Sequence, residues 1–193
     1  MNPELLNQLA LTRVPNIGDV QAKILINHLG DASSVFNAKR SLLEKIEGIG
    51  EVRAKSIKEF QDFHLAEHEL KFIEKYNIKT LFLTDAGYPK RLLNCYDSPT
   101  LLFYKGNADL NASKVLAIVG TRSNTDYGKL FTEKLVKDLS EQNILIISGL
   151  AHGIDAIAHK AALKNSWPTV GVVGHGLDKV YPSENTNLAK DMV

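Results

Sequence analysis

Two short blocks of sequence restrict what this chain can fold into. The first, residues 117–122, reads Ala-Ile-Val-Gly-Thr-Arg, and the second, residues 146–159, reads Ile-Ile-Ser-Gly-Leu-Ala-His-Gly-Ile-Asp-Ala-Ile-Ala-His. In each block an apolar run rich in β-branched residues ends in a turn of small residues, after which a helix is expected. Such a turn leaves backbone N–H groups unpaired at a helix N-terminus, where the helix dipole favours an anion. Two such turns on neighbouring strands predict one phosphate-binding edge.

Arg122 is the charged side chain of the first turn. Its guanidinium is planar, permanently charged and forked, which suits contacts with a phosphate. A third apolar strand end follows, with Gly174 and Gly176 directly after it. Ligands of open α/β sheets bind at the carboxyl ends of parallel strands, so the three strand ends together predict a single binding site.

The wider pattern in this part of the chain is an alternation of strands and helices. We expect strands at Thr80–Thr84, Val115–Val119, Ile144–Ser148 and Thr169–Val173, and helices at Tyr127–Glu141, Ile154–Lys164 and Glu184–Val193. The turn-rich stretch Asp85–Asn107 is interpreted as a connector that packs on the sheet. Strands separated by helices favour a parallel sheet with right-handed crossovers. The predicted fold of residues 77–193 is therefore α/β, a Rossmann-like, doubly wound parallel sheet.

The last residues have the character of the middle of a crossover helix. A doubly wound sheet usually holds more strands than the few expected here. We therefore expect the sheet to be truncated at its C-terminal side, with one edge uncovered, and the chain to be part of a longer protein.

Residues 1–76 are predicted to form a small all-α module with an internal repeat. Val-Pro-Asn-Ile-Gly-Asp-Val-Gln-Ala-Lys-Ile at 14–24 parallels Ile-Glu-Gly-Ile-Gly-Glu-Val-Arg-Ala-Lys-Ser-Ile at 46–57. Each copy reads as a helix end, a hairpin and a new helix. A longer helix is expected from about Val52 to Tyr76.

The repeated hairpin resembles the helix-hairpin-helix motif, in which backbone N–H groups of a Gly-apolar-Gly turn hold a phosphate. Gly48 and Gly50 match this motif, with Arg53 and Lys55 just downstream, whereas the first copy has Asn16 in place of the first glycine. Two interpretations stay open. Either Gly48, Gly50 and Arg53 contact DNA, or the pair is a compact helical module whose hairpins need glycine for positive φ.

Composition and spacing exclude several other classes. The formal net charge of +1 excludes a strongly basic nucleic-acid binder but not a local basic face. The single cysteine, Cys95, excludes a disulfide framework and cysteine-based zinc sites. No apolar run approaches the roughly 20 residues of a membrane span, and the N-terminus does not read as a signal peptide. We therefore expect a cytoplasmic protein.

The remaining motifs give no support to a metal or a bound cofactor. His152, His159 and His175 lack the spacing of a catalytic zinc site. The turn at Gly120 lacks the G-x-G-x-x-G spacing of dinucleotide-binding turns, and no Walker A loop occurs. Asp155 is expected to brace the turn at 148–153.

From about Ile78 onward the chain resembles the DNA-processing protein A (DprA/Smf) family. The matching motifs, in order, are Gly87-Tyr88-Pro89, Ser98-Pro99, Leu102–Gly106, Ile118–Arg122, Tyr127-Gly128, Ser148–Asp155, Ala158-His159 and Gly176–Asn185. The helical N-terminal module also fits, because members often carry a sterile-alpha-motif (SAM) or helix-hairpin-helix-like domain there.

The resemblance implies a single-stranded DNA-binding protein that protects incoming DNA during natural transformation and helps load the RecA recombinase. It implies a homodimer, no cofactor and no enzymatic activity. Arg122 would contact a DNA phosphate, and Lys179 would replace the basic residue that members often carry where Ser183 stands. The pocket around that phosphate would be shaped by residues of the two turns, namely Gly120, Thr121, Ser148, Gly149 and Gly153.

Two other functions stay open. A Rossmann-like nucleotide hydrolase or phosphoribohydrolase also uses glycine-rich strand ends, but it requires a catalytic carboxylate near a Gly-Gly-x-Gly-Thr turn, which this chain lacks. The other alternative is a protein-interaction module for recombination.

Overall fold

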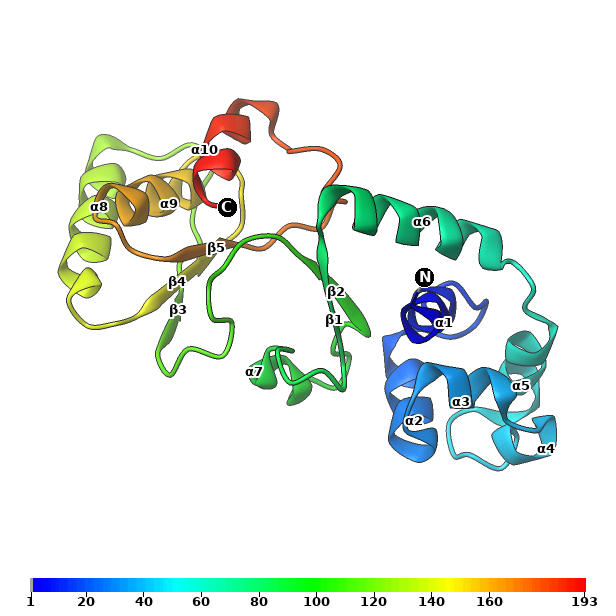
Figure 1. The fold of residues 1–193 in the computed structure, drawn as a ribbon. Helices are drawn as coiled ribbons and strands as arrows, with labels where there is room; N and C mark the ends of the chain where they lie inside the picture. The colour runs from blue at the N-terminus through cyan, green and yellow to red at the C-terminus, as the bar shows by residue number, and fades with distance from the viewer. Residues whose placement is uncertain (1) are drawn as a thin grey trace. The chain divides into compact units, whose positions relative to one another are not determined.

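The computed structural model describes residues 2–193 of the chain (Figure 1). These residues form two compact units, the first running to Lys105 and the second covering Gly106–Val193.

The first unit begins with helices α1 (Pro3–Leu11), α2 (Asp19–Leu29), α3 (Ala32–Asn37), α4 (Arg40–Leu43), α5 (Gly50–Glu59) and α6 (Phe63–Tyr76). Local side chains set some of their boundaries. The side chain of Asn2 accepts hydrogen bonds from the backbone at the start of α1, and the carboxylate of Asp31 caps α3 through the Ser34 N–H at 2.6 Å.

The long helix expected from Val52 to Tyr76 is wrong, because the chain leaves the helix at Phe60. This residue has ψ near 120°, and α6 begins only at Phe63. The break lets the rings of Phe60 and Phe63 pack against each other at 5.3 Å between centroids, with Phe36 of α3 beside both. Neither glycine nor proline marks this position, so tertiary packing of aromatic rings decides it.

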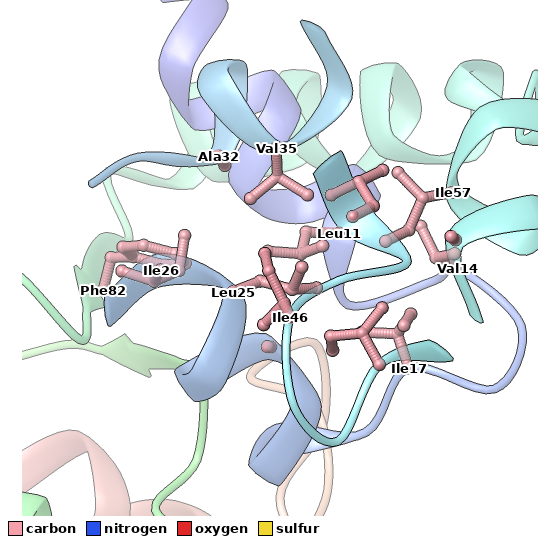
Figure 2. Packing of buried hydrophobic residues seen from close by; sticks show 14 residues of the cluster. Leu11, Val14, Ile17, Leu25, Ile26, Ala32, Val35, Ile46, Ile57 and Phe82 are labelled. Atoms are coloured by element: carbon pink, nitrogen blue, oxygen red, sulfur yellow. The ribbon is translucent and has the colours of Figure 1, made fainter. Parts of the chain in front are cut away.

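The core of the first unit lies where its helices meet (Figure 2). Leu25 of α2, Val35 of α3 and Ile57 of α5 are buried in it. Phe82, which comes shortly after the last of these helices, is fully buried in the same cluster. The first unit is therefore larger than its helices alone.

Phe82 belongs to a β-hairpin-like pair that the sequence did not indicate. Strand β1 (Lys79–Phe82) pairs antiparallel with β2 (Leu101–Tyr104), and the short helix α7 (Lys90–Leu93) lies between them in the chain. The strand expected at 80–84 is thus present, but it is not part of the parallel sheet. Its partner β2 lies inside the stretch 85–107, which the sequence indicates as a connector. The many turn residues of this stretch make a strand of only four residues difficult to recognise.

Two charged side chains of α2 fasten this pair to the helices. Lys23 Nζ donates to the carbonyl oxygens of Leu93 and Cys95 at 2.7 and 2.8 Å and to Ser98 Oγ at 3.0 Å. Asp19 Oδ1, one helical turn away, accepts from both the N–H and the hydroxyl of Thr100 at 2.8 and 2.7 Å. These contacts keep β1 and β2 in the same compact unit as the helices, a unit that runs to Lys105. The domain boundary at 76/77 stays a prediction.

The second unit is the expected α/β part. Strands β3 (Val115–Ala117), β4 (Leu145–Ser148) and β5 (Thr169–Gly171) form a parallel sheet in the order β3-β4-β5. Helix α8 (Asp126–Ser140) connects the first two strands, α9 (Ile154–Lys164) the second two, and η1 (Ser183–Asn185) and α10 (Thr186–Asp191) follow β5. The predicted alternation of parallel strands and helices is confirmed. The described strands follow one another in a single direction across the sheet.

Helices α8 and α9 pack side by side (Figure 1). Val136 of α8, Ala158 and Ala162 of α9 and Ile146 of β4 share one buried cluster. Because the strands are parallel, the loops that lead from β3 to α8 and from β4 to α9 lie at the same, carboxyl end of the sheet.

Candidate functional site

The carboxyl ends of β3 and β4 bring the two predicted turns together. The backbone N–H of Ile154, the first residue of α9, donates to the carbonyl oxygen of Thr121 at 3.1 Å. The turn after β3 is thus tied to the N-terminus of the helix that follows β4. The arrangement expected from the sequence, two turns at one edge, is present in the second unit.

Two glycines make this close approach possible. Gly153 has φ of +78°, and a Cβ atom there would lie 2.1 Å from the carbonyl oxygen of Thr121. A Cβ at Gly120 would lie 2.6 Å from the Cβ of Ile154. Both positions therefore require glycine for contact between the turns, and neither needs a ligand to explain it.

Arg122 lies on the exposed surface of the first turn. Among residues 2–193 its guanidinium makes no hydrogen bond and no ion pair. The preceding Thr121 shapes the turn, because its Oγ1 accepts from the N–H of Ser123 at 3.2 Å. The turn thus presents an unpaired, permanently charged fork to solvent.

Ser148 and Gly149 have supporting positions in the second turn. Ser148 is buried, and its hydroxyl donates to the carbonyl oxygen of Ile118 at 2.7 Å. At Gly149 a Cβ atom would lie 2.6 Å from Oδ2 of Asp155. That carboxylate oxygen accepts from the N–H of Ala151 at 3.3 Å, which confirms the expected bracing role of Asp155.

His159 holds the same turn from inside the unit. It is fully buried, with Nε2 at 2.6 Å from the carbonyl oxygen of Gly149 and Nδ1 at 2.7 Å from Oγ1 of Thr169. Because a carbonyl oxygen only accepts, Nε2 carries the hydrogen of the neutral ring, and Nδ1 faces the hydroxyl of Thr169, which also lies 3.1 Å from the carbonyl oxygen of Ile146. Burial lowers the pKa of His159, which favours this neutral form.

Asn185 completes the set of supports. Its side-chain Nδ2 donates to the carbonyl oxygens of Leu150 and Ala151 at 2.9 and 3.2 Å, and the residue is buried. The sequence pattern assigned no site role to His159 or Asn185. Their only signal was membership of the matching motifs, because the residue types alone do not show which carbonyl a side chain will reach.

A cleft of about 460 Å³ lies beside Gly153. Lys129 of α8 and Lys160 of α9 line it, together with His152 and Glu184, whose Nε2 and Oε2 atoms are 3.9 Å apart. Sequence reasoning missed both lysines, because they belong to helices and not to the glycine-rich turns. Lys179, by contrast, is exposed in the loop after β5 and does not line this cleft.

The two helical hairpins of the first unit share the first part of their turn but differ at its second glycine, since Gly18 is extended with φ of −101° and Gly50 has φ of +65°. Asn16 and Gly48 occupy corresponding positions with φ of 65° and 83°. The following N–H groups, of Ile17 and Ile49, each donate to the carbonyl three residues earlier, at 3.2 and 3.0 Å. Asparagine is among the few non-glycine residues that tolerate the left-handed region, so the first copy keeps the turn without glycine.

Arg53 is occupied within this hairpin pair. Its Nε donates to the carbonyl oxygen of Asn16 at 3.2 Å and its Nη1 to that of Gly48 at 3.1 Å. It therefore joins the two copies of the repeat. Gly50, with φ of +65°, is the first residue of α5, and no side chain caps this helix.

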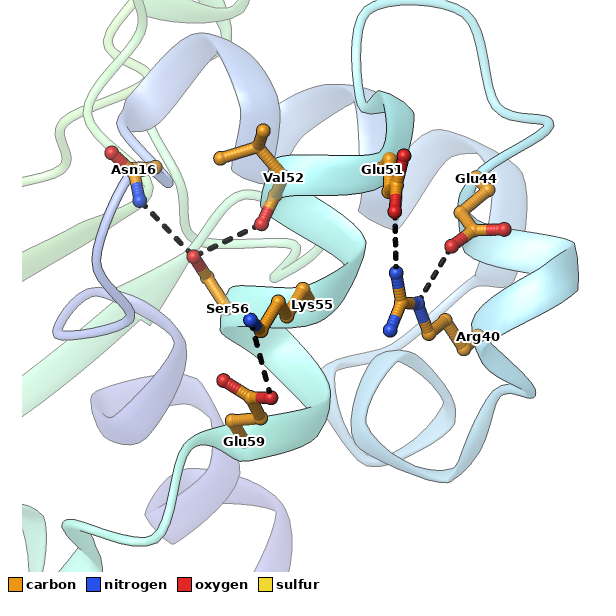
Figure 3. A network of polar contacts seen from close by, with 8 residues as sticks. All are labelled: Asn16, Arg40, Glu44, Glu51, Val52, Lys55, Ser56 and Glu59. Carbon is orange, nitrogen blue, oxygen red and sulfur yellow. Dashed lines mark hydrogen bonds and ion pairs between the residues drawn. The ribbon is translucent and has the colours of Figure 1, made fainter.

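Acidic side chains surround the cations near this hairpin (Figure 3). Arg40 binds Glu44 at 2.6 Å and Glu51 at 3.1 Å, and Lys55 lies 3.8 Å from Glu59. These exposed ion pairs add little stability, but they reduce the positive charge available to a phosphate.

Within residues 2–193, neither unit contains a helix that could span a membrane or a cluster of metal-binding side chains. No helix within residues 2–193 is both long and apolar enough to span a bilayer. Across the same residues, His, Cys, Asp and Glu side chains nowhere gather in threes suitable for a metal ion.

Comparison with known proteins adds independent information. Residues 79–193 match the family described as DNA recombination-mediator protein A. DNA processing protein DprA of Streptococcus pneumoniae is 42% identical over 130 residues, which cover 67% of this chain and 44% of that protein. Protein Smf of Synechocystis is 34% identical over 194 residues, covering 97% of this chain and 48% of that protein.

Solved structures agree with these sequence matches. The X-ray structure of DprA from Streptococcus pneumoniae superposes with a TM-score of 0.68 at 31% identity, covering 95% of this chain and 61% of that one. A Helicobacter pylori DprA structure, described for its single-stranded DNA binding mode, has a TM-score of 0.51 at 30% identity over 60% of this chain and 51% of that one. The chain spans about half the length of the curated relatives it matches. On the family match and these identities, the chain belongs to the DNA recombination-mediator protein A family, the DprA/Smf proteins.

Proposed function

We propose that this protein binds single-stranded DNA through phosphates held at the carboxyl ends of β3 and β4. The observation that carries the proposal is Arg122, an exposed and unpaired guanidinium at the junction of two turns that are tied together. In the cytoplasm such a protein would protect incoming DNA during natural transformation and help load RecA, acting as a homodimer without a cofactor. The relative from Helicobacter pylori, which is described as binding single-stranded DNA, supports this reading.

Phosphate is the group that this edge suits. Gly120, Gly149 and Gly153 let the two turns pack closely against each other and against α9, and α9 directs its positive dipole end toward the same turns. Lys129 and Lys160 add cations in the adjoining cleft, which Glu133 and Glu184 also line. Contacts to phosphate carry no base information, so we expect binding that tolerates many sequences.

An enzymatic role receives less support from the same geometry. A hydrolase needs a carboxylate free to act beside the bound phosphate. Asp155, the acidic residue of the β4 turn, is buried and accepts from the N–H of Ala151. Its position explains it as a brace. Glu133 and Glu184 line the adjoining cleft, but they lie on α8 and η1 and not on the two turns, and we propose a binding protein and not an enzyme.

The helical module contributes less to our proposal. A DNA contact through Gly48, Gly50 and Arg53 would have to use backbone N–H groups, since two nitrogens of the Arg53 guanidinium already bind carbonyl oxygens. We favour a packing role for these hairpins.

The proposal is tested by reversing one charge. We expect Arg122→Glu to weaken binding of a thymidine oligomer by roughly ten- to a hundredfold, because a charge-assisted hydrogen bond is lost and repulsion is added. The slope of log affinity against log salt should also fall by about 0.7 for each phosphate that the variant no longer binds. Filter binding at several salt concentrations measures both quantities.

Lys164→Glu is the matched control, because it makes the same charge change at an exposed residue in the last turn of α9. If the two variants bind alike, Arg122 has no specific role and the proposed site is wrong. Release of free base from a nucleoside monophosphate by the wild-type protein would favour the hydrolase instead.

A further inference from the structure

Helix α8 carries two large aromatic side chains on its exposed surface. Tyr127 is 77% exposed and Phe131 is 57% exposed. Their ring centroids lie 6.2 Å apart at an interplanar angle of 28°, so the rings form a stacked pair. Exposed aromatic rings of this size are costly in water, and a contiguous pair of them marks a surface that contacts something.

The helical repeat explains why the pair faces outward. Tyr127 and Phe131 are four residues apart and lie on one face, whereas Thr132 and Val136 on the opposite face are buried against the rest of the unit. Lys134 is exposed and follows Phe131 on the outer face. The outer face of α8 therefore combines two rings with a cation.

This face is joined rigidly to the proposed phosphate site. The loop from Gly120 to Thr125 connects Arg122 directly to α8. One end of the loop is tied to α9 by the bond from Ile154 N to Thr121 O, and the other caps α8 through the bond from Gly128 N to Thr125 Oγ1 at 3.1 Å. Arg122 and Tyr127 thus belong to one short segment with fixed ends.

We propose that Tyr127 and Phe131 form a stacking surface for unpaired bases of the DNA strand whose phosphate lies at Arg122. This inference rests on the proposed function. Every base has a π-face, so such stacking tolerates all sequences. In a duplex the base faces are already stacked on one another and are not available. The aromatic pair would therefore favour single-stranded over double-stranded DNA.

The nature of the face favours bases over a protein partner. A protein interface normally surrounds its apolar centre with a polar rim and spans many residues. Here the apolar residues form a narrow stripe of Tyr127, Leu130 and Phe131 next to a cation and continuous with an unpaired arginine. Proteins that bind single-stranded nucleic acid use this combination of aromatic rings and cations.

The test compares aromatic and aliphatic residues of the same stripe. Tyr127→Ala and Phe131→Ala should each weaken binding of a thymidine oligomer by roughly five- to a hundredfold, the range for loss of one base stack. Leu130→Ala is the matched control, since Leu130 is 64% exposed on the same stripe but cannot stack. Its affinity should stay within about twofold of the wild type.

A second probe separates bases from phosphates. An abasic oligomer of the same length keeps the phosphates but removes the bases. The wild-type protein should bind it more weakly than the thymidine oligomer, whereas the Tyr127→Ala, Phe131→Ala double variant should bind both alike. The salt dependence of the double variant should equal that of the wild type, because every phosphate-binding group is still in place.

Three results would overturn the inference. The first is unchanged affinity in the double variant while Arg122→Glu still weakens binding, which would leave the proposed function intact. The second is an equal loss from Leu130→Ala, which would indicate a general apolar contact. The third is a change of oligomeric state in the double variant, measured by light scattering, without a change in base preference. If instead the wild type and Arg122→Glu bind the thymidine oligomer with equal affinity, the proposed function itself is refuted.

Discussion

Gly153→Ala tests whether contact between the two strand-end turns holds the site together. Gly153 has φ of +78° with ψ of −130°, a conformation essentially confined to glycine, and holding an alanine there costs about 1–3 kcal/mol. The added Cβ would also lie 2.1 Å from the carbonyl oxygen of Thr121. The turns must then separate, and the hydrogen bond from Ile154 N to Thr121 O, worth about 0.5–1.5 kcal/mol, is lost.

Together these effects predict a loss of about 2–4 kcal/mol in the free energy of unfolding, a large part of the stability of an ordinary domain. Urea denaturation followed by circular dichroism measures this loss. Thymidine-oligomer binding should weaken as well, by up to about tenfold, because Arg122 is no longer held beside α9.

Gly174→Ala is the control for this substitution. Gly174 belongs to the third glycine-rich strand end, but a Cβ there meets no atom within 4 Å and its φ is not positive. Its stability and affinity should match the wild type. If Gly153→Ala is as stable as Gly174→Ala, then the turns do not depend on close contact, and our account of the site's rigidity is wrong.

Two further predictions concern His159 and the helical hairpins. Burial lowers the pKa of His159 in the folded protein, whereas in the unfolded chain this histidine takes up a proton near pH 6.5. The free energy of unfolding should therefore be highest above that pH and should fall as the pH drops further. In urea denaturation the fall should be steeper for the wild type than for His159→Gln, and equal falls would contradict this. The double substitution Arg53→Ala, Lys55→Ala should lower the stability of the first unit, since the Arg53 guanidinium bonds to the carbonyl oxygens of both hairpins. It should leave DNA affinity within about twofold of the wild type. A clear loss of affinity with unchanged stability would instead support a helix-hairpin-helix contact.

Regular alternation made the second unit predictable. Helix α9 runs from Ile154 to Lys164 in the structure, as the sequence indicated, and β5 pairs with β4 in the parallel sheet. In this unit the hydrophobic pattern of each helix and strand is regular, and small residues mark where the helices begin. The local sequence preferences therefore agree with the tertiary structure. The turns at Gly120 and Gly149 could be placed for the same reason.

The first unit was harder to predict because long-range contacts decide it. Strand β2 lies among turn residues and gains its partner only through β1. The break after α5 depends on Phe36, a residue distant in sequence from Phe60. The boundary after Lys105 depends on Lys23 and Asp19, whose spacing on a helix looks like that of ordinary surface charges. None of these contacts leaves a periodic signal.

The polar residues of the matching motifs have two distinct tasks, and this division fits the anion site that we propose for a nearly neutral protein. Ser148, His159 and Asn185 donate from the protein side to backbone carbonyl oxygens of the strand ends, those of Ile118, Gly149 and Leu150 respectively. A carbonyl oxygen left facing the turn would repel a phosphate, so each of these buried donors removes a negative partial charge from the ligand's surroundings. Only Arg122 then has to supply full charge at the surface of the turn. An overall charge near zero is therefore compatible with the proposed phosphate binding, because the field would come from oriented backbone groups and a few local cations, Arg122 with Lys129 and Lys160, and not from an overall excess of basic residues.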